Sequence, residues 1–317
     1  PLTKTSHSMF GLDEVRAASQ RIRPIALRTP VLRHVSPHGE LYLKCENLQT
    51  GGAFKIRGAA NFVYSLTPAE RVNGVVAFSS GNHAQAVAIA AKSVGIPATI
   101  VMPLDAPRVK VEGTRSHGAT IVTYDRFTED RVAIGKRIAE ETGAVLVPPF
   151  DHEWTMTGQG TAGLELLEEV PDLDAIVVPI GGGGFISGVA IAAHGIDPKI
   201  KVIGVEPEDG NDTYLSLQAG KYVEIPPPAS IADGLRAPSP GKLTLPVIQK
   251  HVDRIVLVSD DEIRSAMRFL MSTMKLVVEP SGAVTVAAAL TGKLAGVRKV
   301  GLMLSGGNVD LAELPIS

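Results

Sequence analysis

The amino-acid sequence predicts an α/β protein built from two doubly wound open-sheet domains, and three observations support this prediction. Hydrophobic residues make up 44% of the chain but aromatic residues only 4%, which is typical of buried parallel sheets with aliphatic strands. Short aliphatic runs alternate with helix-forming segments in two successive blocks. The length of 317 residues suits roughly two domains of 100 to 200 residues each.

The first block, residues 74–146, is expected to fold as a small domain. Its predicted strands are aliphatic runs bounded by turn residues, namely Val75–Phe78, Ala98–Met102, Thr120–Tyr124 and Val145–Val147. Helices are predicted between these strands, at Ala84–Val94, after Pro107 towards His117, and around Thr128–Thr142. This alternation is the pattern of a doubly wound sheet.

The second block begins at residue 147 and is expected to supply a larger domain. Its predicted strands are Asp174–Pro179, Lys201–Glu206, Arg254–Val258 and Val300–Leu304, with helices near Phe185–His194, Asp260–Met271 and Ser281–Leu294. The strand-like segment Leu41–Cys45 precedes the first block, and we assign it to the second sheet. Residues 1–73 and 147–317 then form one discontinuous domain, and a ligand site is expected in the cleft beside the inserted domain.

The charge balance and the single cysteine exclude several classes of protein. The chain has 31 basic and 33 acidic residues, a net charge of -2 and no basic stripe, so nucleic acid is not an expected partner. Cys45 is the one cysteine, which excludes an intrachain disulfide, suggests a reducing compartment and predicts a small buried side chain. The N-terminal segment contains no apolar secretory signal, so a cytoplasmic location is expected.

One segment has the length of a membrane span but not its pattern. Ala175–Ala193 carries no charge over nineteen residues. Pro179 and four consecutive glycines interrupt it, and they predict a strand, a loop and a helix. We therefore expect no membrane partner.

One lysine stands between a glycine pair and a helix-forming run in the segment KCENLQTGGAFKIRGAAN, residues 44–61. Lys55 falls near a predicted helix N-terminus, beside Arg57 and between the apolar Phe54 and Ile56. The partly positive helix end, the guanidinium and the apolar neighbours all disfavour the ammonium form. A lysine with a lowered pKa can form an imine with a carbonyl compound. A solvated surface lysine is the alternative for this segment alone.

A run of small polar residues follows the predicted strand that ends at Phe78. Exposed backbone N–H groups and hydroxyls at a helix N-terminus suit a carboxylate, which makes Ser79, Ser80, Asn82 and His83 candidate substrate ligands. The alternatives are that Ser80 or Asn82 only caps the helix and that His83 is a structural hydrogen-bonding residue.

Four glycines between a predicted strand and a predicted helix let backbone N–H groups approach a phosphate closely. The candidate phosphate ligands are Gly181, Gly182, Gly183 and Gly184. The spacing also approximates the GxGxxG fingerprint of dinucleotide sites, which would make the protein a nicotinamide-dependent oxidoreductase. Ser187 stands where that fingerprint needs its third glycine, and this alternative leaves the lysine segment unexplained.

Two further loops follow predicted strands. Glu206, the Gly210 carbonyl and Asp212 offer hard oxygen ligands suited to Mg²⁺ or Ca²⁺, with a solvated acidic loop as the alternative. Ser305 ends the last strand and places a hydroxyl where the strand's carboxyl end faces the cleft, with an ordinary turn as the alternative.

In this order the segments resemble pyridoxal-phosphate enzymes of fold type II, the tryptophan synthase β group, and most closely the serine/threonine dehydratase and serine racemase family. The resemblance spans nearly the whole chain. Its motifs are Arg28–Leu32, FKIRGA around Lys55, SSGNHAQA, the GGGG loop, GVEP, Ile231–Gly234, Val278–Gly282 and LSGGN. Each motif is modest alone, and the order makes them specific.

The resemblance implies a role for each candidate. Lys55 would carry pyridoxal 5'-phosphate as a Schiff base, Phe54 would pack against the pyridine ring and Asn82 would bind the ring hydroxyl. The glycine loop, Gly181–Gly184, and the Phe185 backbone would hold the phosphate. Residues 74–146 would form the substrate-binding domain and the rest of the chain the cofactor-binding domain. A homodimer and an amino-acid substrate are also implied.

The implied reaction is β-elimination from L-serine, L-threonine or 3-hydroxyaspartate to a 2-oxo acid and ammonia. Lys55 would take the α-proton and help to expel the β-hydroxyl. Ser305 would face the pyridine nitrogen, and a neutral serine there favours elimination over transamination. Glu206, Gly210 and Asp212 match the family's site for Mg²⁺, Mn²⁺ or Ca²⁺.

Three positions qualify the resemblance. Gly51 stands where the family commonly has threonine, which leaves the detail of substrate contact open. Ser80 is the residue that racemases of the family use on the face opposite the lysine, so amino-acid racemisation is an alternative activity. Arg131 is a candidate ligand for a second substrate carboxylate, with a solvated helix charge as the alternative. No long extension follows LSGGNVDL, so no isoleucine-binding regulatory domain is expected.

Overall fold

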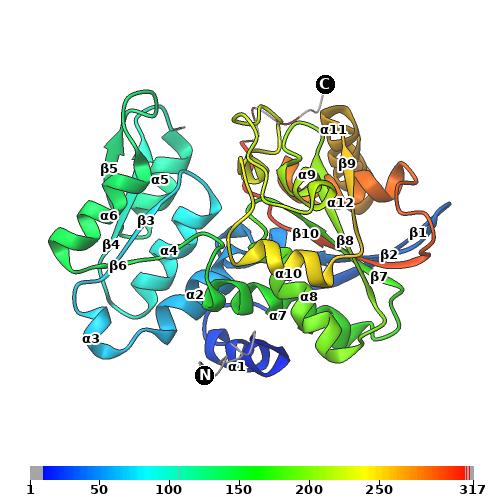
Figure 1. Ribbon diagram of the computed structural model, residues 1–317, viewed down its shortest axis with the longest axis horizontal. Helices are drawn as coiled ribbons and strands as arrows, with labels where there is room; N and C mark the ends of the chain where they lie inside the picture. The colour runs from blue at the N-terminus through cyan, green and yellow to red at the C-terminus, as the bar shows by residue number, and fades with distance from the viewer. Residues whose placement is uncertain (1–9, 107, 311, 313, 315–317) are drawn as a thin grey trace, which may run out of the picture.

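The computed structural model describes residues 10–106, 108–310, 312 and 314. In this part of the chain the strands form two open sheets that lie side by side, each with helices on both faces (Figure 1). The predicted α/β class with two doubly wound sheets is therefore confirmed. Residues 1–9 and 315–317, which the predicted large domain includes, lie outside the described residues.

The larger sheet has six strands in the order β1-β2-β10-β7-β8-β9. Its strands are β1 (Val31–Ser36), β2 (Gly39–Cys45), β7 (Ala175–Pro179), β8 (Lys201–Pro207), β9 (Arg254–Val258) and β10 (Lys299–Leu304). All neighbouring strands are parallel except β1 and β2, which form an antiparallel hairpin. Lys44 on β2 pairs with Met303 on β10, which confirms that this early strand belongs to the second sheet.

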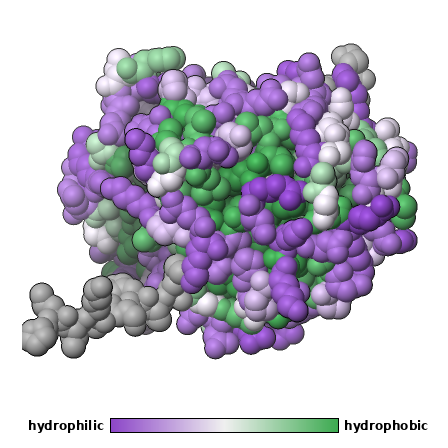
Figure 2. Space-filling model, turned by 45° about the vertical axis from the view of Figure 1, so that its right-hand side comes forward, coloured by the Kyte–Doolittle hydropathy of each residue, from purple (hydrophilic) through white to green (hydrophobic). Residues whose placement is uncertain are grey.

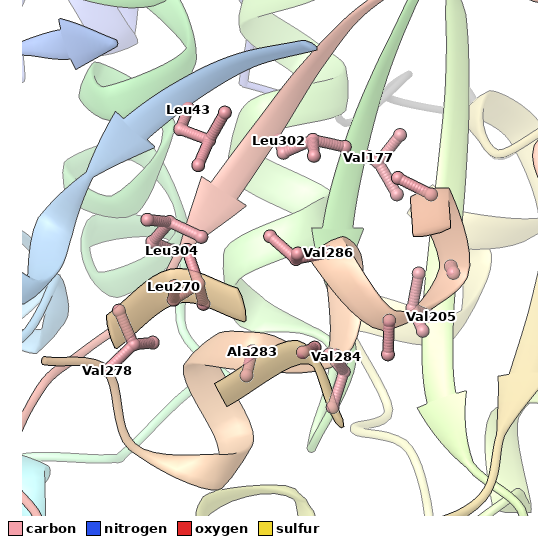
Figure 3. Packing of buried hydrophobic residues seen from close by; sticks show 14 of the residues in the cluster. Leu43, Val177, Val205, Leu270, Val278, Ala283, Val284, Val286, Leu302 and Leu304 are labelled. Carbon is pink, nitrogen blue, oxygen red and sulfur yellow. The ribbon is translucent and has the colours of Figure 1, made fainter. Parts of the chain in front are cut away.

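The central strands of this sheet, β7, β8 and β10, are buried on both faces. Along β7, Ala175 and Val177 pack on one face whereas Ile176 and Val178 pack on the other, because successive side chains of a strand point in opposite directions. The first face is covered by α11 (Asp260–Phe269) and α12 (Pro280–Leu290), and the second by α7 (Glu153–Glu169), α8 (Gly184–Ile196) and α10 (Thr244–His251). Figure 3 shows Val284 and Val286 of α12 in the same cluster as Val177 and Val205 of the sheet.

The smaller sheet has four parallel strands in the order β5-β4-β3-β6. These are β3 (Val75–Phe78), β4 (Ala98–Pro103), β5 (Thr120–Tyr124) and β6 (Val145–Leu146). The helices of this part are α2 (Lys55–Ser65), α4 (Asn82–Ser93), α5 (Arg108–Ser116) and α6 (Arg131–Thr142). Although α2 precedes residue 74, its apolar side chains share one hydrophobic cluster with β3, β4 and α4. The boundary drawn at residue 73 stays a prediction.

The remaining elements are short or lie at the edges. They are α1 (Leu12–Ile22), η1 (Glu46–Leu48), η2 (Thr50–Gly52), α3 (Pro68–Arg71), α9 (Asp212–Ala219), η3 (Asp233–Leu235) and the π-helical η4 (Leu270–Met274). The uncharged segment at 175–193 folds as β7, a glycine loop and α8, as predicted. Among the described residues, no helix is both long enough and apolar enough to cross a membrane.

Candidate active site

The candidate residues lie in loops that follow the carboxyl ends of parallel strands. Ser79 follows β3, Gly181 follows β7 and Ser305 follows β10. In open α/β sheets, ligands bind at these ends. The sequence therefore places the candidates on the functional edge of both sheets, and the contacts below show which of them meet.

Lys55 is the first residue of α2, as predicted, and a tight turn places it there. Gly51 and Gly52 adopt φ angles of 72° and 73°, which glycine tolerates and other residues rarely adopt. A Cβ on Gly51 would also lie 2.8 Å from Ile89 Cδ1, which gives a physical reason for glycine at this position. The Lys55 Nζ atom donates to the Pro149 carbonyl at 2.9 Å.

Burial lowers the pKa of Lys55 to about 8. The sequence attributed such a shift partly to Arg57, and that reason is wrong. The Arg57 guanidinium donates to both carboxylate oxygens of Glu46 and of Glu165, so its charge is compensated. The amine loses its proton more readily than that of an ordinary lysine because burial disfavours the charged form.

Phe54 connects the lysine segment to the glycine loop. Its ring stacks on the ring of Phe185 with centroids 3.9 Å apart and planes 10° from parallel. Lys55 Nζ lies 5.2 Å from the Phe54 ring centroid. The Phe54 N–H donates to the Ser305 carbonyl at 3.0 Å. These contacts bring Phe54, Lys55, Phe185 and Ser305 together.

The glycine loop is packed so closely that side chains have no room. A Cβ on Gly182 would lie 2.3 Å from the Phe150 ring, and one on Gly184 would lie 2.8 Å from Phe150 Cβ. Gly183 has a φ angle of 92°, and a Cβ there would lie 2.8 Å from Thr244 Oγ1. A Cβ on Gly181 would lie 3.0 Å from the carbonyl oxygen of Gly234.

The loop leads directly into α8, which begins at Gly184. The N–H groups of a helix's first turn have no intrahelical acceptor and carry a partial positive charge. A backbone this bare at a helix N-terminus fits a phosphate group.

The polar run after β3 forms the start of α4. Ser79 Oγ accepts from the Gly81 N–H at 3.1 Å, and Ser80 is half-buried in the same turn. His83 is buried with its Nε2 atom 3.0 Å from the Val147 carbonyl. Burial and the nearby charge of Lys55 lower the pKa of His83 to about 3, so the imidazole stays neutral and donates to that carbonyl.

Asn82 links the two sheets through residues to which the sequence assigned no role. Its Nδ2 atom donates to Glu279 Oε1 at 2.6 Å, and its Oδ1 atom accepts from Asn308 Nδ2 at 2.9 Å. Glu279 and Asn308 lie in the quoted motifs VEPSG and LSGGN, but only the fold shows that they meet Asn82. Burial and the charge of Asp233 raise the pKa of Glu279 to about 8.

The acidic residues predicted to bind a cation come together between β8 and α9. Glu206 is fully buried and accepts from the backbone N–H groups of Thr213 and Tyr214 at 3.1 and 2.8 Å. Burial and the Asp212 charge raise the pKa of Glu206 to about 8, and burial raises that of Asp212 to about 7. The Asp212 Oδ1 atom is buried without a hydrogen-bond partner among the described residues.

Arg131 differs from the other candidates because its side chain is exposed. It is exposed in the first turn of α6, with its guanidinium carbon 5.7 Å from the Phe78 ring centroid. Phe78 directly precedes Ser79, so Arg131 lies beside the strand end that carries the two serines. Its predicted contact with substrate stays a prediction.

Comparisons with known proteins agree with this geometry. The family profile described as "Pyridoxal-phosphate dependent enzyme" matches residues 22–306. The chain is 50% identical over 304 residues to an L-threo-3-hydroxyaspartate ammonia-lyase of Saccharomyces cerevisiae, covering 94% of this chain and 93% of that protein. It is 47% identical over 305 residues to a serine racemase of Schizosaccharomyces pombe, covering 94% of each. The solved structure of maize serine racemase superimposes with a TM-score of 0.92 at 46% identity, covering 95% of this chain and 94% of that one.

Proposed function

Because the chain belongs to the family of pyridoxal-phosphate dependent enzymes, we propose that it catalyses β-elimination from a β-hydroxy amino acid. The family assignment confirms the prediction made from the motifs and replaces the nicotinamide alternative. The observation that carries the proposal is the half-buried Lys55, whose pKa is lowered to about 8 beside the glycine loop. The net reaction removes the α-proton and the β-hydroxyl, and water then replaces the amino group to give a 2-oxo acid and ammonia.

The residues of the site fit the cofactor. The bare backbone at the start of α8 suits the phosphate, and the glycines are required because Phe150 and Thr244 approach the loop closely. Phe54 offers an aromatic face for the ring, and Lys55 an amine for the aldehyde carbon. When bound, pyridoxal phosphate supplies an electron sink for the α-carbon of the substrate.

The protein's own groups would move the protons. Lys55 Nζ, with its pKa lowered to about 8, gives up its proton more readily than an ordinary lysine, so it can accept the α-proton and return it towards the departing hydroxyl. Ser305 is neutral and buried, and a neutral partner for the ring nitrogen favours elimination. Neutral His83 does not compete as a base because its pKa is lowered to about 3.

The central experiment replaces Lys55. Lys55→Ala should abolish the visible absorbance of bound cofactor and lower 2-oxo acid release from L-serine, L-threonine and 3-hydroxyaspartate by several orders of magnitude, because attachment and proton transfer both depend on one amine. Lys92→Ala, an exposed lysine of α4, is the matched control. Near-native turnover by Lys55→Ala would contradict the proposal.

The three substrates also test which residue recognises the side chain of the substrate. An L-threo-3-hydroxyaspartate ammonia-lyase is the relative with 50% identity, and we propose that Arg131 binds the second carboxylate of such a substrate. Arg131→Ala should depress turnover of 3-hydroxyaspartate far more than that of serine. Equal losses on both substrates would count against this role.

Ser80 supports racemisation as a second activity. It lies half-buried in the loop between β3 and α4, one residue before Gly81, and a relative with 47% identity is a serine racemase. If Ser80 protonates the α-carbon from the face opposite Lys55, Ser80→Ala should abolish racemisation and the elimination of D-substrates but spare elimination of L-substrates. Chiral analysis of serine after incubation measures both, and retained racemisation would overturn the two-base assignment.

We also propose that Glu206, Asp212 and the Gly210 carbonyl hold a divalent cation. The orphaned Asp212 Oδ1 and the raised pKa values of both carboxyls fit a site that needs a positive charge. Within the described part of the chain no three His, Cys, Asp or Glu side chains are placed so that they could hold a metal ion, so the carbonyl and waters would complete the shell. The cation would neutralise the pair and join the end of β8 to α9.

A homodimer is the assembly we propose. Figure 2 shows apolar residues gathered on one face within a hydrophilic frame. The exposed Leu27, Leu48 and Val277 lie in adjoining segments, since Gln49 bonds to the Leu27 backbone and Asn47 to the Val277 carbonyl. Leu48→Glu should shift the protein to monomers in sedimentation, whereas Val72→Glu should not. The cytoplasmic location stays a prediction.

A further inference from the structure

Asn82, Glu279 and Asn308 come from three distant segments and form one continuous chain of hydrogen bonds. Asn308 Nδ2 donates to the Gly51 carbonyl at 2.7 Å and to Asn82 Oδ1 at 2.9 Å. Asn82 Nδ2 then donates to Glu279 Oε1 at 2.6 Å. We call these three side chains with the Gly51 carbonyl the amide relay.

The direction of every hydrogen bond in the amide relay follows from its Gly51 end. A peptide carbonyl can only accept, so the atom of Asn308 that faces Gly51 must be the nitrogen. That nitrogen has two hydrogens, and the second one requires an accepting atom, so Asn82 turns its oxygen towards Asn308. The nitrogen of Asn82 is thereby turned towards Glu279.

Glu279 agrees with this direction in both of its charge states. An ionised carboxylate accepts only, and a protonated carboxyl still offers one accepting oxygen. The pKa of Glu279, which burial and Asp233 raise to about 8, therefore does not reverse the relay. The Asn82 nitrogen keeps a second hydrogen that the relay does not use.

The amide relay is attached to the segments that carry the other candidate cofactor contacts. Gly51 lies four residues before Lys55 and Asn308 three residues after Ser305. The Glu279 N–H donates to the Gly306 carbonyl at 3.1 Å. The unused hydrogen of Asn82 is thus held at the junction of the lysine and serine segments.

We propose that Asn308 and Glu279 are positioning residues that hold the Asn82 amide in one orientation, with its nitrogen donating to an oxygen atom on the cofactor ring. This inference rests on the proposed function, since it assumes that Asn82 faces the ring. An amide turned by half a rotation would present an oxygen there, and two acceptors would face each other. Neither positioning residue touches the reacting atoms.

The test measures the dissociation constant of pyridoxal phosphate from the apoprotein by absorbance titration, beside the melting temperature of the apoprotein. In Asn308→Asp an acceptor faces both Gly51 and Asn82, so the Asn82 amide must turn. We expect the dissociation constant to rise at least about tenfold and the melting temperature to fall. Glu279→Gln alone can accept from Asn82 as before, and we expect a change below about threefold. Asn73→Asp, exposed before β3, controls for the added charge.

The double variant Asn308→Asp/Glu279→Gln separates positioning from stability. The amide introduced at position 279 can donate to the turned Asn82 oxygen, while the carboxylate introduced at position 308 accepts from the turned nitrogen. All hydrogen bonds between these side chains are then restored in reverse. We expect the melting temperature to recover relative to Asn308→Asp while the dissociation constant stays raised at least about tenfold.

Two outcomes would overturn the proposal. One is wild-type cofactor affinity in Asn308→Asp, and the other is recovery of both affinity and stability in the double variant. The double variant keeps the test available if Asn308→Asp does not fold. A wild-type protein that binds no pyridoxal phosphate would instead refute the proposed function, so the two failures are distinguishable.

Discussion

The buried charges around Arg57 and those around Glu206 are compensated in different ways. The first group, which we call the Arg57 cluster, contains the cations Lys44 and Arg57 and the carboxylates Glu46 and Glu165, joined by ion pairs of 2.7 to 2.8 Å. The second group, the Glu206 pair, contains Glu206 and Asp212, and among the described residues only backbone N–H groups and a hydroxyl donate to it. One group is balanced by the protein's own side chains, and the other has negative charge alone.

The pKa values show what this difference does. Burial acts to raise the pKa of Glu46, but the Arg57 guanidinium outweighs it and the pKa is lowered. Burial also acts on Glu206, where Asp212 adds to it and the pKa rises to about 8. Equal burial therefore leaves one carboxyl ionised and the other protonated near neutral pH. The Arg57 cluster is complete in the protein alone, whereas the Glu206 pair needs a proton or a cation.

Removing the Arg57 side chain from the Arg57 cluster should give the largest loss of stability. Arg57→Met leaves the buried Glu46 without its ion-pair partner, while Glu165 keeps Lys44. We expect the free energy of unfolding to fall by about 3–5 kcal/mol. Urea unfolding of the apoprotein measures this. Arg264→Met removes an exposed pair with Asp261 on α11 and should cost less than about 1 kcal/mol. A loss from Arg57→Met as small as that of the control would show that the cluster is not energetically distinct.

Removing a cation from the Glu206 pair should give the next largest effect. We expect a chelator to lower the melting temperature and Mg²⁺, Mn²⁺ or Ca²⁺ to restore it, since a ligand at 100 times its dissociation constant stabilises by about 2.7 kcal/mol. Asp212→Asn should remove the response, whereas Asp105→Asn, on the exposed surface, should keep it. A melting series unchanged by chelator would argue against a structural cation.

Local sequence patterns explain which helices and strands could be predicted. β3, β5 and β9 have the predicted bounds because each is an aliphatic run between turn residues. α7 was not predicted, since its three glycines, Gly158, Gly160 and Gly163, argue against a helix. The fold supplies the reason for two of them. A Cβ would lie 2.5 Å from the Arg57 carbonyl at Gly158 and 2.5 Å from the Gly188 carbonyl at Gly160.

The parts of the candidate site that depend on neighbouring residues in the sequence could be predicted, and the contacts between distant segments could not. Lys55 and the glycine loop stand in short motifs whose chemistry depends on neighbouring residues, and the structure places them at the helix starts that were expected. The partners of Asn82 lie 197 and 226 residues away, so no spacing reveals them. Arg57 was misread for the same reason, because Glu165 is 108 residues away. The predicted helix at Asp260–Met271 instead changes to a π-helix at Leu270.

The smallest expected effect is a difference between the Arg57 cluster and the Glu206 pair in how stability depends on pH. In chelator the folded Glu206 pair has pKa values of about 8 and about 7, above the ordinary values of 4.5 and 3.8. The folded state then binds more protons than the unfolded state, so this contribution is present at low pH and is lost as pH rises through the folded pKa values. Glu46, whose pKa is lowered, contributes stability that is lost only as pH falls below its unfolded value.

Between pH 6 and pH 7, therefore, the contribution of the Glu206 pair to stability should change, whereas that of the Arg57 cluster should not. We expect the contribution of this pair to the unfolding free energy in chelator to fall by about 2 kcal/mol over this unit, since each group contributes up to about 1.4 kcal/mol per pH unit while it is protonated. Saturating Mg²⁺ keeps both carboxylates ionised and should remove the contribution of the Glu206 pair to the slope. The difference between the two series is the measured quantity, so Glu279 and other titrating groups cancel. The variant Glu206→Gln/Asp212→Asn should show no difference between the series in chelator and the series in Mg²⁺. If the wild-type slope is the same in both series, the raised pKa values do not arise from a cation site.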